Sequence, residues 1–274
     1  MRKNYSFAIV ILILGVAVYS ASLEVVVIPS LYMQKNFKAS VITPCEYGKN
    51  KKRFSVIYFL HGYGGDYSTW PGIASLKEYS DKYQLIFICP DGNRNSWYID
   101  SPFKKNSRFE TYIAKEVVGF ADAHYRTWSK CSGRAITGSS MGGHGAMTII
   151  AKNPDVFCGA GSISGILDLT AFPEQWDLPE VLGNYDLNPE IWRKNSFTGL
   201  LENLKGKNKA LIIDCGTMDF ALPVNLEVHE MLNSLNISHE YINRPGNHSY
   251  VYCAKNVESV IRYLNNVLEQ PGYE

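Results

Sequence analysis

This sequence of 274 residues lacks the features that mark several classes of protein. Its 27 basic and 26 acidic residues leave a net charge of only +1, so no excess of one sign indicates nucleic acid or an anionic surface as a partner. It has no internal repeat and no low-complexity linker, and 46% of its residues are hydrophobic. These properties predict one ordinary globular domain, since α/β folds of this size are often single.

The six cysteines follow no metal-binding pattern. None forms a C-x-x-C pair or a spacing typical of zinc sites, so we predict no metal site. Cys89 and Cys215 lie in apolar, strand-like segments, where cysteine behaves as a small core residue. An even number of cysteines permits disulfides in an exported chain, but the sequence does not determine any pairing.

No apolar run near the N-terminus is long enough to span a bilayer comfortably. Residues 7–18 are apolar, follow the basic residues Arg2 and Lys3, and precede small residues at 18–22. We predict that residues 1–22 are a signal peptide cleaved near residues 20–22, and that residues 23–274 are the mature domain. The mature protein would be secreted or periplasmic, without stable membrane association. The alternative is an uncleaved anchor, and no cysteine follows the run to carry a lipid.

Strand-like and helical segments alternate along the rest of the chain. Almost unbroken apolar runs, such as residues 54–60, are typical of strands covered on both faces. Strands are expected at residues 23–28, 37–43, 54–60, 85–89, 134–137, 157–162, 210–214 and 240–243, the first two as an antiparallel edge. Helices are expected at residues 73–83, 109–125, 141–153, 224–235 and 257–268. This alternation predicts an α/β fold with a mainly parallel sheet and helices on both faces.

The strongest local signal is the segment 134–153, RAITGSSMGGHGAMTIIAKN. It has the pattern of a strand, a tight turn and a helix, with Gly138 and Gly142 two residues either side of Ser140. A serine at the tip of such a turn exposes its Oγ, and a side chain at either glycine position would collide with the turn. Ser139 fails this test because its neighbours at the same spacing are not glycine. We therefore predict Ser140 as a nucleophile, against the alternative of a glycine-rich helix cap.

A serine nucleophile needs a base, and the base needs an acid that orients it. In a parallel sheet both should lie on loops after later strands, in the order serine, acid, histidine. Among the six histidines, only His248 lies in a loop just past a late strand, so we predict it as the base. Two acids precede it, Asp214 at a strand end and Asp219 in the following loop. We favour Asp219, which can reach across the strand ends, and expect Asp214 to bind local backbone N–H groups.

The intermediate of acyl transfer carries an oxyanion that two backbone N–H groups usually stabilise. One should come from Met141, the residue after the nucleophile. The other should come from the glycine turn at residues 61–65, where we choose the N–H of Tyr63. The alternative is that these glycines only make a tight turn.

Aromatic residues mark the candidate substrate contacts. We predict Trp97, Tyr98 and His144 as substrate-binding residues, although aromatic side chains are equally ordinary pocket walls. Residues 165–204 carry Trp176 and little clean periodicity. We interpret this segment as an insertion after the elbow helix and the next strand, forming a lid or pocket wall.

Five segments, in this order, resemble the esterase D-like family of esterases: LHGYGG, PDGNRNSWYIDSP, GSSMGGHGA, DCGTMDF and RPGNHSY. That family includes S-formylglutathione hydrolases, tributyrin-type esterases, the feruloyl and acetyl-xylan esterases of carbohydrate esterase family one, and mycolyltransferases. The resemblance covers nearly the whole mature chain. It implies the α/β-hydrolase fold, no cofactor, and the roles given above for Ser140, Asp219, His248, Tyr63 and Met141.

The resemblance has one departure. Family members often carry tryptophans after the catalytic histidine, whereas this chain has Ser249-Tyr250-Val251-Tyr252-Cys253. The family pattern therefore does not specify the pocket for the acyl group or the sugar.

Together these observations predict an exported serine carboxylesterase that forms an acyl-enzyme, with acetyl or feruloyl esters of plant polysaccharide as substrates. Alternatives are a short-chain, tributyrin-type carboxylesterase, an S-formylglutathione hydrolase-like thioesterase, and a mycolyl-type acyltransferase in which an alcohol replaces water. The thioesterase is disfavoured because glutathione chemistry is cytosolic. A non-catalytic carbohydrate-binding protein with a hydrolase fold is the alternative from another class, and the intact set Ser140, Asp219 and His248 argues against it. The sequence does not determine the oligomeric state.

Overall fold

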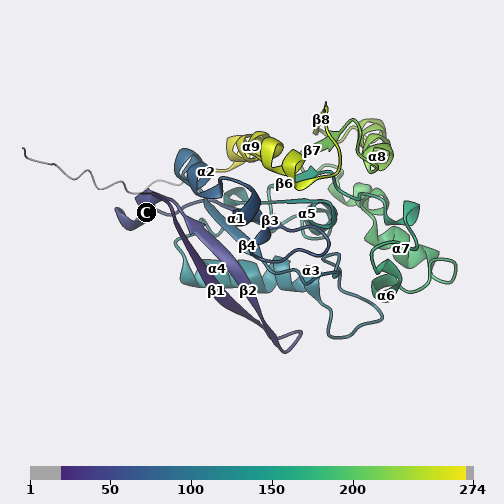
Figure 1. Ribbon diagram of the computed structural model, residues 1–274, viewed down its shortest axis with the longest axis horizontal. Helices are drawn as coiled ribbons and strands as arrows, with labels where there is room; N and C mark the ends of the chain where they lie inside the picture. Colours follow the sequence, from purple (N-terminus) through teal and green to yellow (C-terminus); the bar gives the residue numbers. More distant parts are fainter. Residues whose placement is uncertain (1–19, 270–274) are drawn as a thin grey trace, which may run out of the picture.

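The computed structural model describes residues 20–269, which form a central eight-stranded sheet with helices on both sides (Figure 1). The strands are β1 (Ser22–Ser30), β2 (Lys35–Thr43), β3 (Val56–Leu60), β4 (Ile86–Pro90), β5 (Arg134–Ser139), β6 (Gly159–Ile163), β7 (Ala210–Gly216) and β8 (Glu240–Arg244). The α-helices are α1 (Thr69–Ile73), α2 (Leu76–Tyr83), α3 (Phe109–Thr111), α4 (Val118–His124), α5 (Met141–Lys152), α6 (Leu178–Leu182), α7 (Pro189–Asn195), α8 (Leu222–Ser234) and α9 (Tyr250–Val267). A π-helical stretch, η2 (Tyr112–Val117), joins α3 to α4.

The predicted signal peptide, residues 1–22, lies mostly outside the described residues. Ser22 begins β1, and the N–H of Ala21 donates to Asp81 Oδ2 at 2.8 Å. Among residues 20–269, no helix has the length and apolar character needed to cross a membrane.

The strands lie in the order β1-β2-β4-β3-β5-β6-β7-β8. β1 pairs antiparallel with β2, and β2 pairs antiparallel with β4, so the predicted antiparallel edge is confirmed. The remaining neighbours, from β4 to β8, are all parallel. This topology confirms the predicted α/β-hydrolase fold. Because parallel strands end at the same edge, the loops after β3 to β8 converge there.

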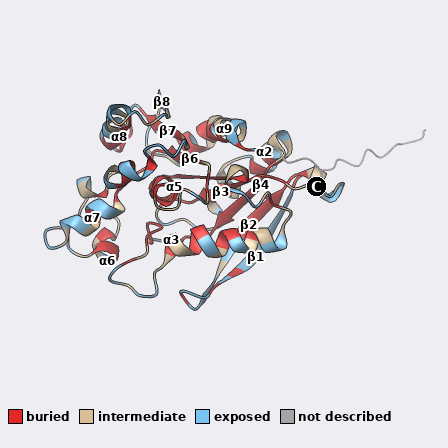
Figure 2. Ribbon diagram, turned by 180° about the vertical axis from the view of Figure 1, so that it is seen from behind, coloured by how far each residue is buried: buried red, intermediate tan, exposed pale blue. Residues whose placement is uncertain are grey.

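Helices cover both faces of the sheet. α1, α2 and α9 share one apolar core with it, and α4, α5 and α8 share the other. Figure 1 shows α2 and α9 on one side of the strands and α4 on the opposite side, and Figure 2 shows buried colouring along the central strands. This double cover explains the unbroken apolar run of β3, in which every residue is buried.

Two predicted helices differ from the structure in their boundaries. The helix expected at residues 73–83 begins later, as α2 at Leu76, and a separate short helix, α1, precedes it because Ala74 is extended (φ −133°, ψ 151°). That break lets Trp70 of α1 turn inward, where its Nε1–H donates to the carbonyl of Leu60 at 2.8 Å. The last helix begins seven residues earlier than expected, because Ser249 caps it through Oγ, which accepts from the N–H of Tyr252 (3.3 Å).

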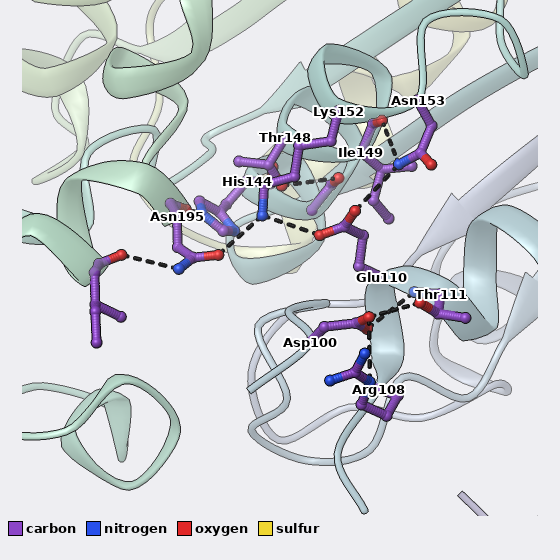
Figure 3. A network of polar contacts seen from close by, with 12 residues as sticks. Asp100, Arg108, Glu110, Thr111, His144, Thr148, Ile149, Lys152, Asn153 and Asn195 are labelled. Carbon is purple, nitrogen blue, oxygen red and sulfur yellow. Dashed lines mark hydrogen bonds and ion pairs between the residues drawn. The ribbon is translucent and has the colours of Figure 1, made fainter. Parts of the chain in front are cut away.

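The insertion at residues 165–204 packs against α5 through a 3₁₀ segment, Phe197–Leu204, and α7 packs on that segment. Polar contacts fix the same junction (Figure 3). Lys152 at the end of α5 binds Asn195 Oδ1 of α7 and Glu110 Oε2, each at 2.9 Å. These contacts attach the insertion to α5. It lies at one end of the sheet, where it extends the domain (Figure 1).

His144 belongs to this junction. It is fully buried on α5, and its Nε2 is 2.8 Å from the carbonyl oxygen of Asn195. Its ring also packs edge-on against the ring of Trp97, with centroids 5.7 Å apart. Burial lowers the pKa of His144 to about 4, so the ring is neutral at pH 7.

The lowered pKa of His144 predicts how stability depends on pH. The unfolded chain binds the proton near pH 6.5, whereas the folded chain does so only near pH 4. The stabilisation is therefore complete above pH 6.5 and is lost as the pH falls toward 4, with about 2 kcal/mol lost by pH 5. Urea unfolding at pH 7 and pH 5 should show a smaller loss for His144→Gln than for the parent. Equal losses would contradict this assignment, since the buried His61 titrates alike in both proteins.

Candidate active site

Ser140 occupies the turn between β5 and α5 with a strained backbone (φ 55°, ψ −117°). A Cβ on Gly138 would lie 2.5 Å from the carbonyl carbon of Gly142. A Cβ on Gly142 would lie 2.1 Å from the carbonyl oxygen of Leu60. The steric reason predicted for the two glycines therefore holds: both flanks of the serine pack against backbone atoms that cannot move aside.

The structure brings together the three side chains predicted from separate parts of the chain. His248 Nε2 is 2.9 Å from Ser140 Oγ. His248 Nδ1 is 2.9 Å from Oδ1 and 3.0 Å from Oδ2 of Asp219. A carboxylate can only accept, so we assign the ring proton to Nδ1, which leaves Nε2 to accept the serine proton. This geometry can deprotonate the hydroxyl and stabilise the resulting imidazolium.

The Asp219 side chain is fully buried, and about a quarter of the His248 side chain is exposed (24%). Burial raises the pKa of Asp219, but the neighbouring side chains of His248 and Ser164 and the N–H of Ala221 outweigh that effect and lower the pKa overall. The carboxylate is therefore ionised at neutral pH, as an acid that faces a histidine must be.

Asp214, the alternative acid, binds other partners. Its buried carboxylate accepts from the hydroxyl of Tyr252 (2.5 Å) and pairs with the guanidinium of Arg244 (2.7 Å). The prediction that it binds local backbone N–H groups is wrong, because β8 supplies the guanidinium of Arg244 and α9 supplies the phenol of Tyr252. The ion pair joins β7 to β8, and the hydrogen bond from Tyr252 joins β7 to α9, so Asp214 contacts both elements that flank His248.

The loops that carry Asp219 and His248 also bind each other through their backbones. The N–H of Thr217 donates to the carbonyl of Arg244, and the N–H of Met218 to that of Gly246, each at 2.9 Å. A Cβ on Gly216 would lie 2.3 Å from Gly246 O, so only glycine permits this approach. The distance between the acid and the base is therefore set by two interlocked loops.

The glycine turn after β3 has a rigid support. His61 Nδ1 is 2.8 Å from the carbonyl of Gly62, and its Nε2 accepts from the N–H of Gly92 at 2.8 Å. Within residues 20–269, the N–H groups of Tyr63 and Met141 have no hydrogen-bond partner. Both are free to donate to a bound oxygen, as an oxyanion site requires.

A cavity of about 240 Å³ opens beside the serine and the histidine. It is lined by Gly62, Tyr63, Trp97, Ser139, Ser140, Ser164, Trp176, Phe220, His248, Ser249, Tyr250 and Cys253. The insertion supplies Trp176, so this segment forms a pocket wall, as predicted.

Of the three predicted substrate contacts, only Trp97 lines the cavity. Tyr98 is buried, and its hydroxyl donates to the carbonyl of His61 at 3.1 Å. His144 is buried against Asn195. The predictions for Tyr98 and His144 are therefore corrected: both support the walls from within the core and are not exposed to a ligand.

Sequence reasoning missed several residues of the cavity, among them Ser164, Phe220 and Tyr250. The ring of Phe220 lies 4.4 Å from that of His248 and stacks on Trp176, with centroids 5.6 Å apart. Each of these three residues follows a parallel strand or adjoins the predicted acid or base. Position at the carboxyl edge of the sheet is the signal that could have found them.

In the described part of the chain, no cluster of three or more His, Cys, Asp or Glu side chains could hold a metal ion. The six cysteines are free thiols, with Cys89 and Cys215 buried in the core. Cys253 lines the cavity, but burial raises its pKa to about 12, so its thiol is protonated at neutral pH.

Known proteins match this chain in sequence. Residues 30–252 match the family described as "Putative esterase". Over 259 residues the chain is 26% identical to an acetyl esterase of Caldicellulosiruptor saccharolyticus, in a match that covers 87% of this chain and 96% of that protein.

Solved structures share the fold. A ferulic acid esterase superimposes with a TM-score of 0.79 at 21% identity, covering 92% of this chain and all (100%) of the other. An S-formylglutathione hydrolase from Agrobacterium tumefaciens superimposes with a TM-score of 0.80 at 20% identity, covering 92% of this chain and 98% of the other. These similarities extend over nearly the whole described domain.

Proposed function

This chain belongs to the putative esterase family, and we propose that its carboxylic-ester hydrolase chemistry uses Ser140 as nucleophile, His248 as general base and Asp219 as the orienting acid. The observation that carries this assignment is the continuous line of short contacts from Asp219 through His248 to Ser140. Ser140 Oγ attacks the ester carbonyl as its proton passes to His248, and the ionised Asp219 stabilises the imidazolium.

The N–H groups of Tyr63 and Met141 are proposed to hold the oxyanion, each lowering the barrier by roughly 3 kcal/mol. His248 then returns its proton to the leaving alcohol, and an acyl-enzyme remains on Ser140. A water molecule, deprotonated by His248, releases the acid and restores the serine. An alcohol in place of water would make the same site an acyltransferase.

The proposed substrates are acetyl or feruloyl esters of plant polysaccharide. Flat aromatic side chains support this proposal, because Trp97, Trp176 and Phe220 form a continuous wall beside His248. Such rings stack well on a phenolic acyl group or on the apolar face of a sugar. The similarity to an acetyl esterase along nearly its whole length supports the smaller acyl group.

The wall formed by Trp176 is held in place by contacts to the proposed oxyanion turn. The hydroxyl of Tyr63 donates to Asp177 Oδ2 at 2.6 Å, and Asn95 donates to the same oxygen at 3.2 Å. The indole N–H of Trp97 donates to the carbonyl of Trp176 at 3.2 Å. A rigid wall supports selection among acyl groups by shape.

Export is proposed from the basic start and the apolar run at residues 7–18. An exported location supports a polysaccharide substrate, because such polymers lie outside the cell. Expression of the full chain in a bacterial host, followed by N-terminal sequencing of the extracellular or periplasmic protein, tests both the export and the cleavage near residues 20–22.

A fluorophosphonate probe tests the nucleophile. We expect the probe to label the parent enzyme on Ser140, and Ser140→Ala to lose both the label and at least a thousandfold in kcat on p-nitrophenyl acetate. Intact-mass spectrometry with peptide mapping gives the labelled residue. Ser139→Ala should still be labelled, since Ser139 is a neighbouring hydroxyl without the contact to His248. A label on Ser139, or full turnover by Ser140→Ala, would refute the assignment.

Paired substitutions distinguish the two acids. Asp219→Asn should lower kcat about 10⁴-fold with little change in melting temperature, because the histidine loses its orienting carboxylate. Asp214→Asn should instead destabilise the fold by about 3 kcal/mol, because it leaves Arg244 without its buried partner. Steady-state kinetics and thermal unfolding of both variants measure the two effects. The reverse pattern would make Asp214 the catalytic acid.

Trp176→Ala tests the aromatic wall. Loss of ring stacking should raise KM for methyl ferulate about 10-fold and leave KM for p-nitrophenyl acetate within about twofold. Rates on methyl ferulate, acetyl-xylan and tributyrin then rank the candidate substrates in the parent. Trp128→Ala is the matched control, since Trp128 lies outside the cavity and its indole contacts Glu269. Equal changes for both acyl groups would show that Trp176 does not select the acyl group.

A further inference from the structure

Ser164 is a buried serine in the cavity that the proposed mechanism does not use. It follows β6 directly, is 1% exposed, and lines the same cavity as Ser140 and His248. Among the described residues, its Oγ makes no hydrogen bond of standard geometry. A buried hydroxyl without a partner costs free energy, so this position requires an explanation.

The backbone of Ser164 adds a second cost. Its φ is +52°, a left-handed conformation that glycine or asparagine adopts more readily than serine. The N–H of Ser164 donates to the carbonyl of Asp214 at 2.7 Å, which fixes the residue in this conformation. Strain of this kind persists where the surrounding fold enforces it and is concentrated at functional sites.

The neighbours of the Ser164 hydroxyl are the carboxylate of Asp219 and the thiol of Cys215. The bond from the N–H of Ser164 to the carbonyl of Asp214 places the residue beside the end of β7, which leads into the loop of Asp219. From there the hydroxyl lowers the pKa of both groups. The thiol of Cys215 is protonated, because burial raises its pKa. The carboxylate is ionised and is by far the stronger acceptor.

Asp219 has room for this donor. Its Oδ1 accepts from the N–H of Ala221 at 2.8 Å and from His248 Nδ1 at 2.9 Å. Its Oδ2 accepts only the longer contact with the same His248 nitrogen, at 3.0 Å. A buried carboxylate offers about four acceptor sites, so Oδ2 can accept a further donor, and the Ser164 hydroxyl has no other partner.

We propose that Ser164 is a positioning residue for the triad: its hydroxyl donates to Asp219 Oδ2 and holds the carboxylate facing His248 as the imidazolium forms. This proposal rests on the proposed function, because Ser164 acts only through Asp219. A carboxylate with donors on both oxygens keeps its orientation while positive charge develops on the histidine.

A double-substitution cycle tests the proposal, with kcat and KM measured on p-nitrophenyl acetate. Ser164→Ala should lower kcat about 10-fold or more and leave KM within about twofold, because one hydrogen bond to a charged group is lost. In the Asp219→Asn background the same change should alter kcat less than about twofold, because the acceptor charge is gone. An equal fall in both backgrounds would overturn the proposal.

Two further variants distinguish the effect of losing the Ser164 hydroxyl from the effect of its backbone strain. Ser164→Gly relieves the strain and should melt at a higher temperature than Ser164→Ala, yet its kcat should be just as low. Recovery of parent kcat in Ser164→Gly would overturn the proposal. Ser162→Ala is the matched control, since Ser162 is a buried serine on β6, two residues before Ser164, whose hydroxyl also has no partner among the described residues and which does not line the cavity. Its kcat should stay within about twofold of the parent, and a fall like that of Ser164→Ala would overturn the proposal.

The outcomes for Ser164 and for the proposed function are distinguishable. A large loss in Asp219→Asn combined with parent-like kcat in Ser164→Ala would remove the role of Ser164 and leave the triad assignment intact. Parent-like kcat in Asp219→Asn would overturn both.

Discussion

The close contact between the elbow of the nucleophile and the end of β3 is the constraint on which the rest of the site depends. Gly138 and Gly142 leave no space for a Cβ against each other or against the carbonyl of Leu60. Ser140 is therefore held in a strained conformation, with its hydroxyl at the carboxyl edge of the sheet. The same contact brings the turn after β3 beside the serine, so the nucleophile and the two free N–H groups are positioned by one packing arrangement.

The acid and the base depend on a second constraint at the far side of the sheet. Backbone hydrogen bonds interlock the loops after β7 and β8, and the buried pair of Asp214 and Arg244, with Tyr252, fixes the elements on either side of them. A pair of this kind contributes little net stability compared with apolar packing, but breaking it is costly. Because the Asp214–Arg244 pair lies beside both loops, it fixes the position of His248 relative to Asp219. The same position determines whether His248 contacts Ser140.

The walls of the cavity are assembled from segments that are distant in sequence and conformationally strained. Trp97 and Trp176 both have positive φ, and the indole of one binds the backbone of the other. Behind them, His144 and Asn195 attach the insertion to α5, the helix that begins directly after Ser140. The shape of the pocket is thus coupled to the helix that follows Ser140, so buried residues such as His144 influence the cavity without lining it.

The sequence by itself determined the fold class and pointed to the proposed nucleophile and base, because each leaves a local signature. Unbroken apolar runs mark strands buried on both faces, glycines at fixed spacing mark the elbow, and a loop after a late strand marks His248. Tertiary structure alone placed Asp219, which the sequence favoured over Asp214, in contact with His248, buried Tyr98 and His144 as internal supports, and brought Ser164, Phe220 and Tyr250 to the cavity. The physical reason is that these roles depend on which loops meet at one edge of the sheet, and contacts between distant loops leave no periodic pattern in the chain.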